Sequence, residues 1–269
     1  MEAFRFLLFP FALLYGLVVR ARNFLFNIKL LPSEKFDIPV ISVGNLIAGG
    51  SGKTPMVEYL VRLLGEGPNV ATLSRGYKRK TKGFLLAGDN ETVETLGDEP
   101  LQYHQKFGSL HVAVCEKRRD GIHELRKNVD GLEVVILDDA FQHRYVNPKL
   151  SILVTDYFKL YHRDWLLPYG RLREPISGRK RADIIVVTKT PRIFSPIVRK
   201  QLIEEIKPYP GQLVCFSFIN YLPFKPLYRS QCDFSAIKES VYSIIMVSGI
   251  GNPGPMEEYL RRFCTDLEL

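Results

Sequence analysis

The chain beyond Pro39 alternates short runs of aliphatic and β-branched residues with longer amphipathic segments. This alternation is typical of βαβ units, in which helices cover a parallel sheet. Strands are predicted over residues 40–43, 70–73, 111–115, 134–138, 151–155, 184–188, 213–218 and 243–247. Helices are expected to follow Thr54, Asp98, Lys117, Ser195 and Pro253. The pattern therefore predicts an α/β fold with a mostly parallel sheet flanked by helices.

The N-terminal segment has a different pattern, because residues 6–19 form an unbroken apolar stretch with arginines on both sides. A membrane-spanning helix needs about 20 apolar residues, so this stretch is expected to be too short to span. A signal peptide would need small residues at its cleavage site, and the bulky run 23–26 does not supply them. Aromatic residues beside cations predict an interfacial helix on an anionic bilayer. The alternative is a buried core helix interrupted by Pro10.

Composition and charge exclude several classes of protein without selecting a function. The chain has 46% hydrophobic and 25% charged residues, which is ordinary for a globular protein and excludes disorder, collagen and coiled coil. Its four cysteines form no C-x-x-C pair, which argues against a disulfide framework or zinc knuckle and favours a reducing compartment. The net charge of +8 is concentrated in residues 151–200. Such a patch suits an anionic lipid, a phosphorylated substrate, nucleic acid or a plain solvated face.

A glycine-rich loop between the predicted strand 40–43 and the helix after it is the strongest chemical signal. Backbone N–H groups of such a loop surround phosphate oxygens, Lys53 would contact the β and γ phosphates, and the Thr54 hydroxyl would ligate Mg²⁺. The loop has Ile47 where the common pattern has glycine, so it is expected to open differently. The alternative is a plain glycine-rich turn. The predicted nucleotide-binding residues are Ile47, Ala48, Gly49, Gly50, Ser51, Gly52, Lys53 and Thr54.

An acidic pair, Asp138 and Asp139, ends the hydrophobic run that begins at Val134. A metal that bridges nucleotide phosphates needs a carboxylate at the end of a neighbouring strand. The predicted metal ligands are therefore Thr54, Asp138 and Asp139. One carboxylate would hold Mg²⁺ while the other orients that ligand or the nucleophile, and the sequence does not distinguish them. The alternative is that the pair caps a turn.

Three further residues are candidates for the chemistry of phosphoryl transfer. Asp98 is either a helix cap or the carboxylate that accepts a proton from an acceptor hydroxyl, and the sequence favours neither. Arg171 and Arg173 would clamp a substrate phosphate or stabilise charge on the transferred group, unless they are ordinary surface arginines. The candidate catalytic residues are Lys53, Asp98, Asp139 and Arg171.

Several motifs together resemble one family. They are residues 42–45 leading into 49–55, then 73–77, 97–100, 138–143, 167–175 and 248–253. This set is similar to the tetraacyldisaccharide 4′-kinases of lipid A biosynthesis, which keep the same unusual phosphate loop with no glycine at the position of Ile47. The resemblance implies a P-loop NTPase-like fold.

The resemblance also implies an activity and a place in the cell. It implies transfer of the ATP γ-phosphate, with Mg²⁺, to the 4′-hydroxyl of a tetraacylated glucosamine disaccharide 1-phosphate, which gives lipid IVA. The site implied is the cytoplasmic face of the inner membrane, with the lipid A precursor and the anionic membrane surface as partners. Asp98 would be the base that activates the sugar hydroxyl. No nucleic-acid ligand is expected, and no protein partner is indicated.

One departure concerns the C-terminus. Members of the family usually continue into a second lobe with an Asp-His-His motif, a histidine of which is thought to pair with the base carboxylate, whereas this chain stops at Leu269. The expected domains are an N-terminal membrane-associated helix (1–33), a P-loop kinase core (34–220) and the start of an incomplete, truncated C-terminal lobe (221–269). The alternatives are that His143 substitutes, or that activity is impaired. A catalytically silent nucleotide-binding protein and a P-loop GTPase-like metallochaperone are the other classes considered.

Overall fold

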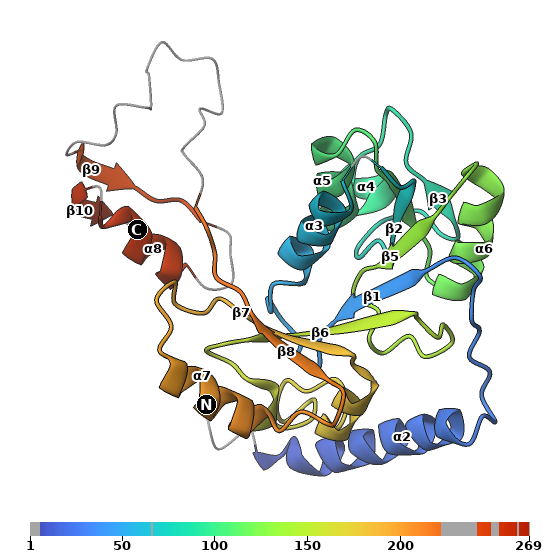
Figure 1. The fold of residues 1–269 in the computed structure, drawn as a ribbon, viewed down its shortest axis with the longest axis horizontal. Helices are drawn as coiled ribbons and strands as arrows, with labels where there is room; N and C mark the ends of the chain where they lie inside the picture. Colours follow the sequence, from blue (N-terminus) through green and yellow to red (C-terminus); the bar gives the residue numbers. More distant parts are fainter. Residues whose placement is uncertain (1–5, 66, 222–240, 249–252, 263, 269) are drawn as a thin grey trace. The chain divides into compact units, whose positions relative to one another are not determined.

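The computed structural model of the chain describes residues 6–65, 67–221, 241–248, 253–262 and 264–268. Contacts within the chain group it into two compact units, Met1–Phe218 and Ile219–Leu269. The first unit contains the large sheet and the N-terminal helix, and the second contains a small two-stranded sheet with one helix (Figure 1).

The first unit is built on an eight-stranded sheet with the order β3-β4-β2-β5-β1-β6-β7-β8. All neighbouring strands are parallel except β3 and β4. The strands are β1 (Val40–Gly44), β2 (Val70–Ser74), β3 (Leu85–Leu86), β4 (His111–Val114), β5 (Val134–Leu137), β6 (Leu150–Asp156), β7 (Ile184–Thr188) and β8 (Leu213–Phe216). This confirms the predicted α/β fold with a mostly parallel sheet.

Helices cover both faces of this sheet because its strands are apolar on both sides. On β5, Val135 and Leu137 pack in the cluster that contains Ile122 and Leu125 of α6, whereas Ile136 packs in the cluster that contains Val57 of α3. The helices of this unit are α2 (Phe9–Asn27), α3 (Lys53–Leu64), α4 (Val93–Leu96), α5 (Asp98–Lys106), α6 (Arg118–Asn128) and α7 (Pro196–Ile206), with 3₁₀ turns η1 (Tyr161–Arg163) and η2 (Ile176–Arg181).

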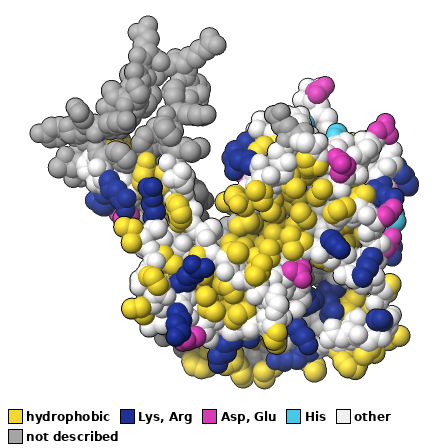
Figure 2. Space-filling model, in the orientation of Figure 1, with side chains coloured by type: hydrophobic (Ala, Val, Ile, Leu, Met, Phe, Trp, Pro, Cys, Tyr) yellow, Lys and Arg dark blue, Asp and Glu magenta, His cyan; other side chains and the backbone are white. Residues whose placement is uncertain are grey.

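The N-terminal helix α2 lies within the predicted segment 1–33 and is longer than the apolar stretch 6–19. Pro10 lies in the first turn, where its fixed φ suits a helix start, so it does not interrupt the helix. The 19-residue helix is long and apolar enough, by length and composition, to cross a membrane, so the expectation that it is too short was wrong. Only 17% of its apolar window is buried, which argues against the core-helix alternative. Apolar side chains are visible along this lower edge of the molecule (Figure 2).

The second unit contains β9 (Val241–Ile245), α8 (Gly254–Leu260) and β10 (Cys264–Glu268), and the two strands are parallel. Met246 and Leu260 are its buried residues in the described part, and the ring of Tyr221 stacks on that of Tyr259 with centroids 4.2 Å apart. The motif noted at residues 248–253 lies mostly outside the described residues, which omit 249–252. Neither β10 nor the two-residue β3 was predicted from the sequence.

Candidate active site

The glycine-rich loop follows β1, which lies between β5 and β6 near the middle of the sheet. The carboxyl ends of adjacent parallel strands meet at one edge, so this loop and the acidic pair after β5 lie together. Gly49 and Gly52 have φ values of 119° and 86°, which L side chains rarely adopt. Gly52 is the residue that caps α3, and the loop therefore turns sharply into the helix at Lys53.

The first half of the loop is fixed by two kinds of contact. The Nδ2 atom of the buried Asn45 donates to Ser51 Oγ at 2.7 Å, which spans the loop. The loop also pairs with the segment that contains Arg171 and Arg173. Ala48 N donates to the Arg171 carbonyl at 2.8 Å, and Arg173 N donates to the Leu46 carbonyl at 2.7 Å. The shape of the loop is thus set before any ligand binds.

The second half of the loop is held by side chains at the end of β7. Thr188 Oγ1 donates to the Ser51 carbonyl at 2.8 Å, and Lys189 Nζ donates to the Gly50 carbonyl at 2.6 Å. Lys189 also pairs with Asp156 at 2.7 Å and has a left-handed φ of 58°. These contacts occupy the loop carbonyls. The N–H groups of Gly50, Gly52 and Lys53 donate to no acceptor in the described part of the chain and are available to an anion.

Two cations meet the second carboxylate of the acidic pair. Lys53 Nζ lies 3.6 Å from Asp139 Oδ1, and one terminal nitrogen of Arg173 donates to both Asp139 oxygens at 2.7 and 2.8 Å. Burial acts to raise the pKa of Asp139, but Lys53 and Arg173 outweigh it and hold the pKa below its usual value. Asp139 is therefore ionised at neutral pH and fixes the position of the Lys53 ammonium.

The first carboxylate of the pair has the opposite environment. Asp138 is 1% exposed, Tyr103 donates its hydroxyl to Oδ2 at 2.9 Å, and Oδ1 has no hydrogen-bond partner. Burial, reinforced by the negative charge of Glu99, raises the pKa of Asp138 to about 6. A buried carboxylate oxygen with no donor is an unfavourable arrangement for the protein alone, and it suits a cation ligand.

The candidate base Asp98 and its neighbour stand at the first turn of α5. Gly97 is the N-cap of α5 and forms no side-chain cap, so Asp98 is the first helical residue and not a cap; the Glu99 N–H donates to Asp98 Oδ1 at 2.9 Å, while the Asp98 side chain remains exposed. Thr54 Oγ1 donates to Glu99 Oε1 at 2.8 Å, which brings the start of α5 to the phosphate loop. Sequence reasoning missed Glu99, although it lies in the segment 97–100 that was singled out for Asp98.

The two arginines of the segment after η1 have separate contacts. Arg171 Nε pairs with Asp164 Oδ2 at 2.8 Å, its side chain is about half exposed, and it does not reach the acidic pair. Arg173 does reach the pair, as described above. Sequence reasoning chose Arg171 and treated Arg173 only as its companion, since spacing alone gave no reason to separate them.

Two more basic residues border this edge: Arg118, which was not a candidate, and His143, which was considered as a substitute for the histidine of the C-terminal lobe. Arg118, 2% exposed, donates to the Cys115 carbonyl at 2.7 Å and to the Asp138 carbonyl at 3.3 Å, and burial lowers its pKa to about 10. His143 is partly buried, and burial together with the charge of Arg118 lowers its pKa to about 4. Its imidazole is therefore neutral at physiological pH.

The residues present fit a magnesium ion bound together with nucleotide phosphates. No cluster of three or more His, Cys, Asp or Glu side chains suited to a metal occurs among the described residues. Magnesium in phosphate-transfer sites is commonly held by one or two protein oxygens, phosphate oxygens and water, so such a cluster is not required. The unpartnered Asp138 oxygen and the Thr54 hydroxyl are hard oxygen donors of this kind.

Comparison with known proteins gives consistent results. Residues 4–268 match the family model described as LpxK, tetraacyldisaccharide-1-P 4′-kinase. A tetraacyldisaccharide 4′-kinase of Parabacteroides distasonis is 46% identical over 96% of this chain and 71% of its own length. The enzyme of that name from Flavobacterium johnsoniae is 46% identical over 97% of this chain and 76% of its length. A crystal structure of LpxK from Aquifex aeolicus in complex with ATP is 32% identical and covers 98% of this chain and 81% of that one, with a TM-score of 0.76.

Proposed function

We propose that this chain, which belongs to the tetraacyldisaccharide-1-P 4′-kinase family, is an ATP-dependent phosphotransferase that acts on a lipid A precursor. The acceptor would be the 4′-hydroxyl of a tetraacylated glucosamine disaccharide 1-phosphate, and the product lipid IVA. The observation that carries the proposal is the pre-shaped phosphate loop, in which the N–H groups of Gly50, Gly52 and Lys53 donate to no acceptor among the described residues and Lys53 is paired with Asp139.

The nucleotide would bind along the loop from Ile47 to Thr54, with its phosphates on the N–H groups and on the Lys53 ammonium. Mg²⁺ would be held by the Thr54 hydroxyl and by Asp138, with Asp139 beside it. When bound, the ion would neutralise charge that develops on the phosphate oxygens. Asp139 and Arg173 would keep Lys53 in the position that contacts the transferred group.

Asp98 is the proposed base. Its exposed carboxylate stands one residue from Glu99, which touches Thr54 of the loop. As the sugar oxygen forms its bond to the γ-phosphorus, the hydroxyl proton would pass to Asp98 and the bond from that phosphorus to the ADP oxygen would break. Arg171, half exposed, would receive a phosphate of the lipid rather than the transferred group, because it lies away from the acidic pair.

We also propose that α2 brings the enzyme to the cytoplasmic face of the inner membrane. Its large apolar side chains are exposed, among them Phe11, Leu14 and Leu17. An exposed apolar face flanked by cations favours the boundary between lipid headgroups and acyl chains. This position would bring the enzyme to a substrate whose acyl chains stay in the bilayer.

The test is transfer of labelled γ-phosphate from Mg-ATP to the tetraacylated disaccharide 1-phosphate in mixed micelles. The label should appear on the lipid, and mass spectrometry with NMR should place it at the 4′ position. A disaccharide that already carries a 4′-phosphate should take up no label. Lys53→Ala should abolish transfer, while Lys80→Ala, a change on the exposed surface, should not. ATP binding without transfer by the unaltered chain would instead support the silent nucleotide-binding protein.

A further inference from the structure

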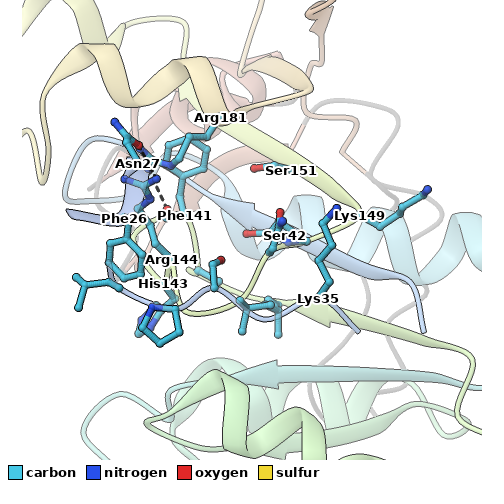
Figure 3. Close-up of a pocket in the computed structure, with 18 of the residues that line it drawn as sticks. Phe26, Asn27, Lys35, Ser42, Phe141, His143, Arg144, Lys149, Ser151 and Arg181 are labelled. Carbon is cyan, nitrogen blue, oxygen red and sulfur yellow. Dashed lines mark hydrogen bonds between the residues drawn. The ribbon is translucent and has the colours of Figure 1, made fainter. Parts of the chain in front are cut away.

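A cavity of about 850 Å³ is lined by the C-terminal end of α2 and by the sheet, and its lining includes Leu137 and Ala140 on either side of the acidic pair but neither Asp138 nor Asp139. No residue of the loop 45–54 lines it. Ser42 of β1 and Ser151 of β6 line its sheet side, and the segment that follows α2 closes another side. Figure 3 shows Arg144 and Arg181 near Phe26 and Phe141 on one side of the cavity, with Lys35 and Lys149 on the other.

The lining of this cavity carries an excess of positive charge. It contains five cationic side chains and one acidic one. The cations are Lys29, Lys35, Arg144, Lys149 and Arg181, and the acid is Asp183. The acid is already engaged, because its Oδ2 accepts the Ser151 N–H at 2.7 Å. The main chains of Lys29 and Lys149 are hydrogen-bonded, but the side-chain ammonium groups of the three lysines form no ion pair or hydrogen bond with another described residue. An anion placed among them would therefore meet little competition from the protein.

One side of the cavity holds two partly buried guanidinium groups. Arg144 donates to the Asn23 carbonyl and to Asn27 Oδ1, both at 2.8 Å, and lies over the Phe26 ring at 4.9 Å. These partners are neutral. Arg181 is paired with Glu174 at 2.8 Å, and burial together with that neighbouring guanidinium lowers the pKa of Arg144 to about 10. One carboxylate thus serves two cations, which leaves positive charge uncompensated on this side.

Apolar surface adjoins the positive charge. Ile28 and Leu30, which are neighbours in sequence of lining residues, and Phe24, one turn before Ile28, are all more than half exposed. They extend the exposed apolar face of α2 to the region of the cavity. A free inorganic anion would use the cations but not this surface. A phospholipid uses both, because its phosphate and its acyl chains are joined.

We propose that this cavity binds the phosphate of an anionic phospholipid whose acyl chains lie along the exposed face of α2. The site is separate from the catalytic one, and the ligand is a membrane component rather than the substrate. The inference rests on the membrane association proposed above for α2, and it adds a specific lipid site to that association. Occupancy would fix the C-terminal end of α2 against the sheet at a membrane surface.

The experiment is calorimetric titration of the full chain with dihexanoylphosphatidylglycerol below its critical micelle concentration. Saturable binding of one lipid per chain is expected, with binding of dihexanoylphosphatidylcholine at least about tenfold weaker. Each lysine near a lipid phosphate contributes about fivefold to affinity. The variant Lys29→Gln/Lys35→Gln/Lys149→Gln should therefore bind more than about tenfold more weakly. The matched control Lys80→Gln/Lys82→Gln/Lys127→Gln removes the same charge elsewhere and should bind as the wild type does.

Two further arms separate this site from the catalytic one. Binding should be unchanged in Lys53→Ala, which excludes the phosphate loop as the lipid site. The cavity variant should also transfer phosphate at the wild-type rate in neutral detergent. The lipid titration measures binding alone, so its result would stand even if the unaltered chain transferred no phosphate. The proposal is overturned if phosphatidylglycerol does not saturate, if both triple variants bind equally, or if inorganic phosphate binds as tightly as the lipid.

Discussion

The hydroxyl of Tyr15 donates a 2.6 Å hydrogen bond to the main-chain carbonyl of Arg173, whose side chain holds Asp139. A helix with an exposed apolar face is thereby joined to the segment that positions the charged centre of the phosphate site. Asn23, further along α2, adds a second bond of 3.3 Å to the buried Glu174. The N-terminal helix is therefore part of the scaffold of the site as well as the proposed membrane contact.

Removing the Tyr15 hydroxyl should destabilise the first unit. A partly buried hydrogen bond contributes about 1 kcal/mol to stability, so Tyr15→Phe should lower the free energy of unfolding by roughly that amount. Denaturant titration in detergent would measure it. Tyr59→Phe, which alters an exposed tyrosine on α3, is the matched control and should leave the midpoint unchanged. Coincident transitions for wild type and Tyr15→Phe would contradict the contact.

The buried Asp138 predicts a pH dependence of stability in the absence of metal. Its folded pKa of about 6 lies above the ordinary value of 3.8, so the folded state binds its proton more tightly than the unfolded state. Stability contributed by this proton is full below about pH 4 and is lost as the pH rises to about 6. The loss is about 3 kcal/mol. Asp138→Asn should lack it, so the difference between the two unfolding curves should grow across that range; a constant difference would refute the assignment.

The two arginines should affect different kinetic constants. Arg173→Gln would release Asp139 to draw Lys53 away from the phosphate, so kcat should fall by about 10²-fold. Arg171→Gln removes a proposed contact to a lipid phosphate and should raise the KM for the lipid about tenfold with little change in kcat. Steady-state kinetics with varied lipid concentration would separate the two. If the two variants changed kcat and the KM for the lipid in the same way, the two side chains would act together and the prediction would be wrong.

Lys189 supports the phosphate loop from the end of β7, and its removal should loosen the loop. Lys189→Met loses the bonds to the Gly50 carbonyl and to Asp156, which leaves that buried carboxylate unpaired. The KM for ATP should rise about tenfold, with a smaller effect on kcat. Lys200→Met, on the exposed side of α7, is the control. A wild-type KM for ATP in Lys189→Met would show that the loop holds its shape without this clamp.

The buried strands were predictable because parallel strands covered on both faces form continuous apolar runs, as Val134–Leu137 does. The two-residue β3 has no such run and pairs antiparallel at the edge of the sheet, so pattern alone did not find it. The apolar segment was judged too short to span because the stretch 6–19 ends at the polar residues Arg20, Arg22 and Asn23, whereas the exposed apolar face of α2 continues to Phe24.

The phosphate loop and the acidic pair were predictable for a topological reason, since both end strands that are neighbours in a parallel sheet. The contacts within the site were not. Thr54 meets Glu99, 45 residues away, and Asp138 meets Tyr103, 35 residues away, through the packing of α5 against the sheet. Arg173 pairs with Asp139, whereas Arg171 is held by Asp164. No local pattern records these pairings.

The most direct test of the account measures phosphate transfer and ATP affinity together in the wild type and in Asp98→Asn. The wild type should label the 4′ position, and the variant should do so about 10²-fold more slowly with an unchanged Kd for ATP. Glu99→Gln is the matched neighbour and should alter ATP binding through Thr54. Full turnover in Asp98→Asn, or no transfer by the wild type despite ATP binding, would contradict the account.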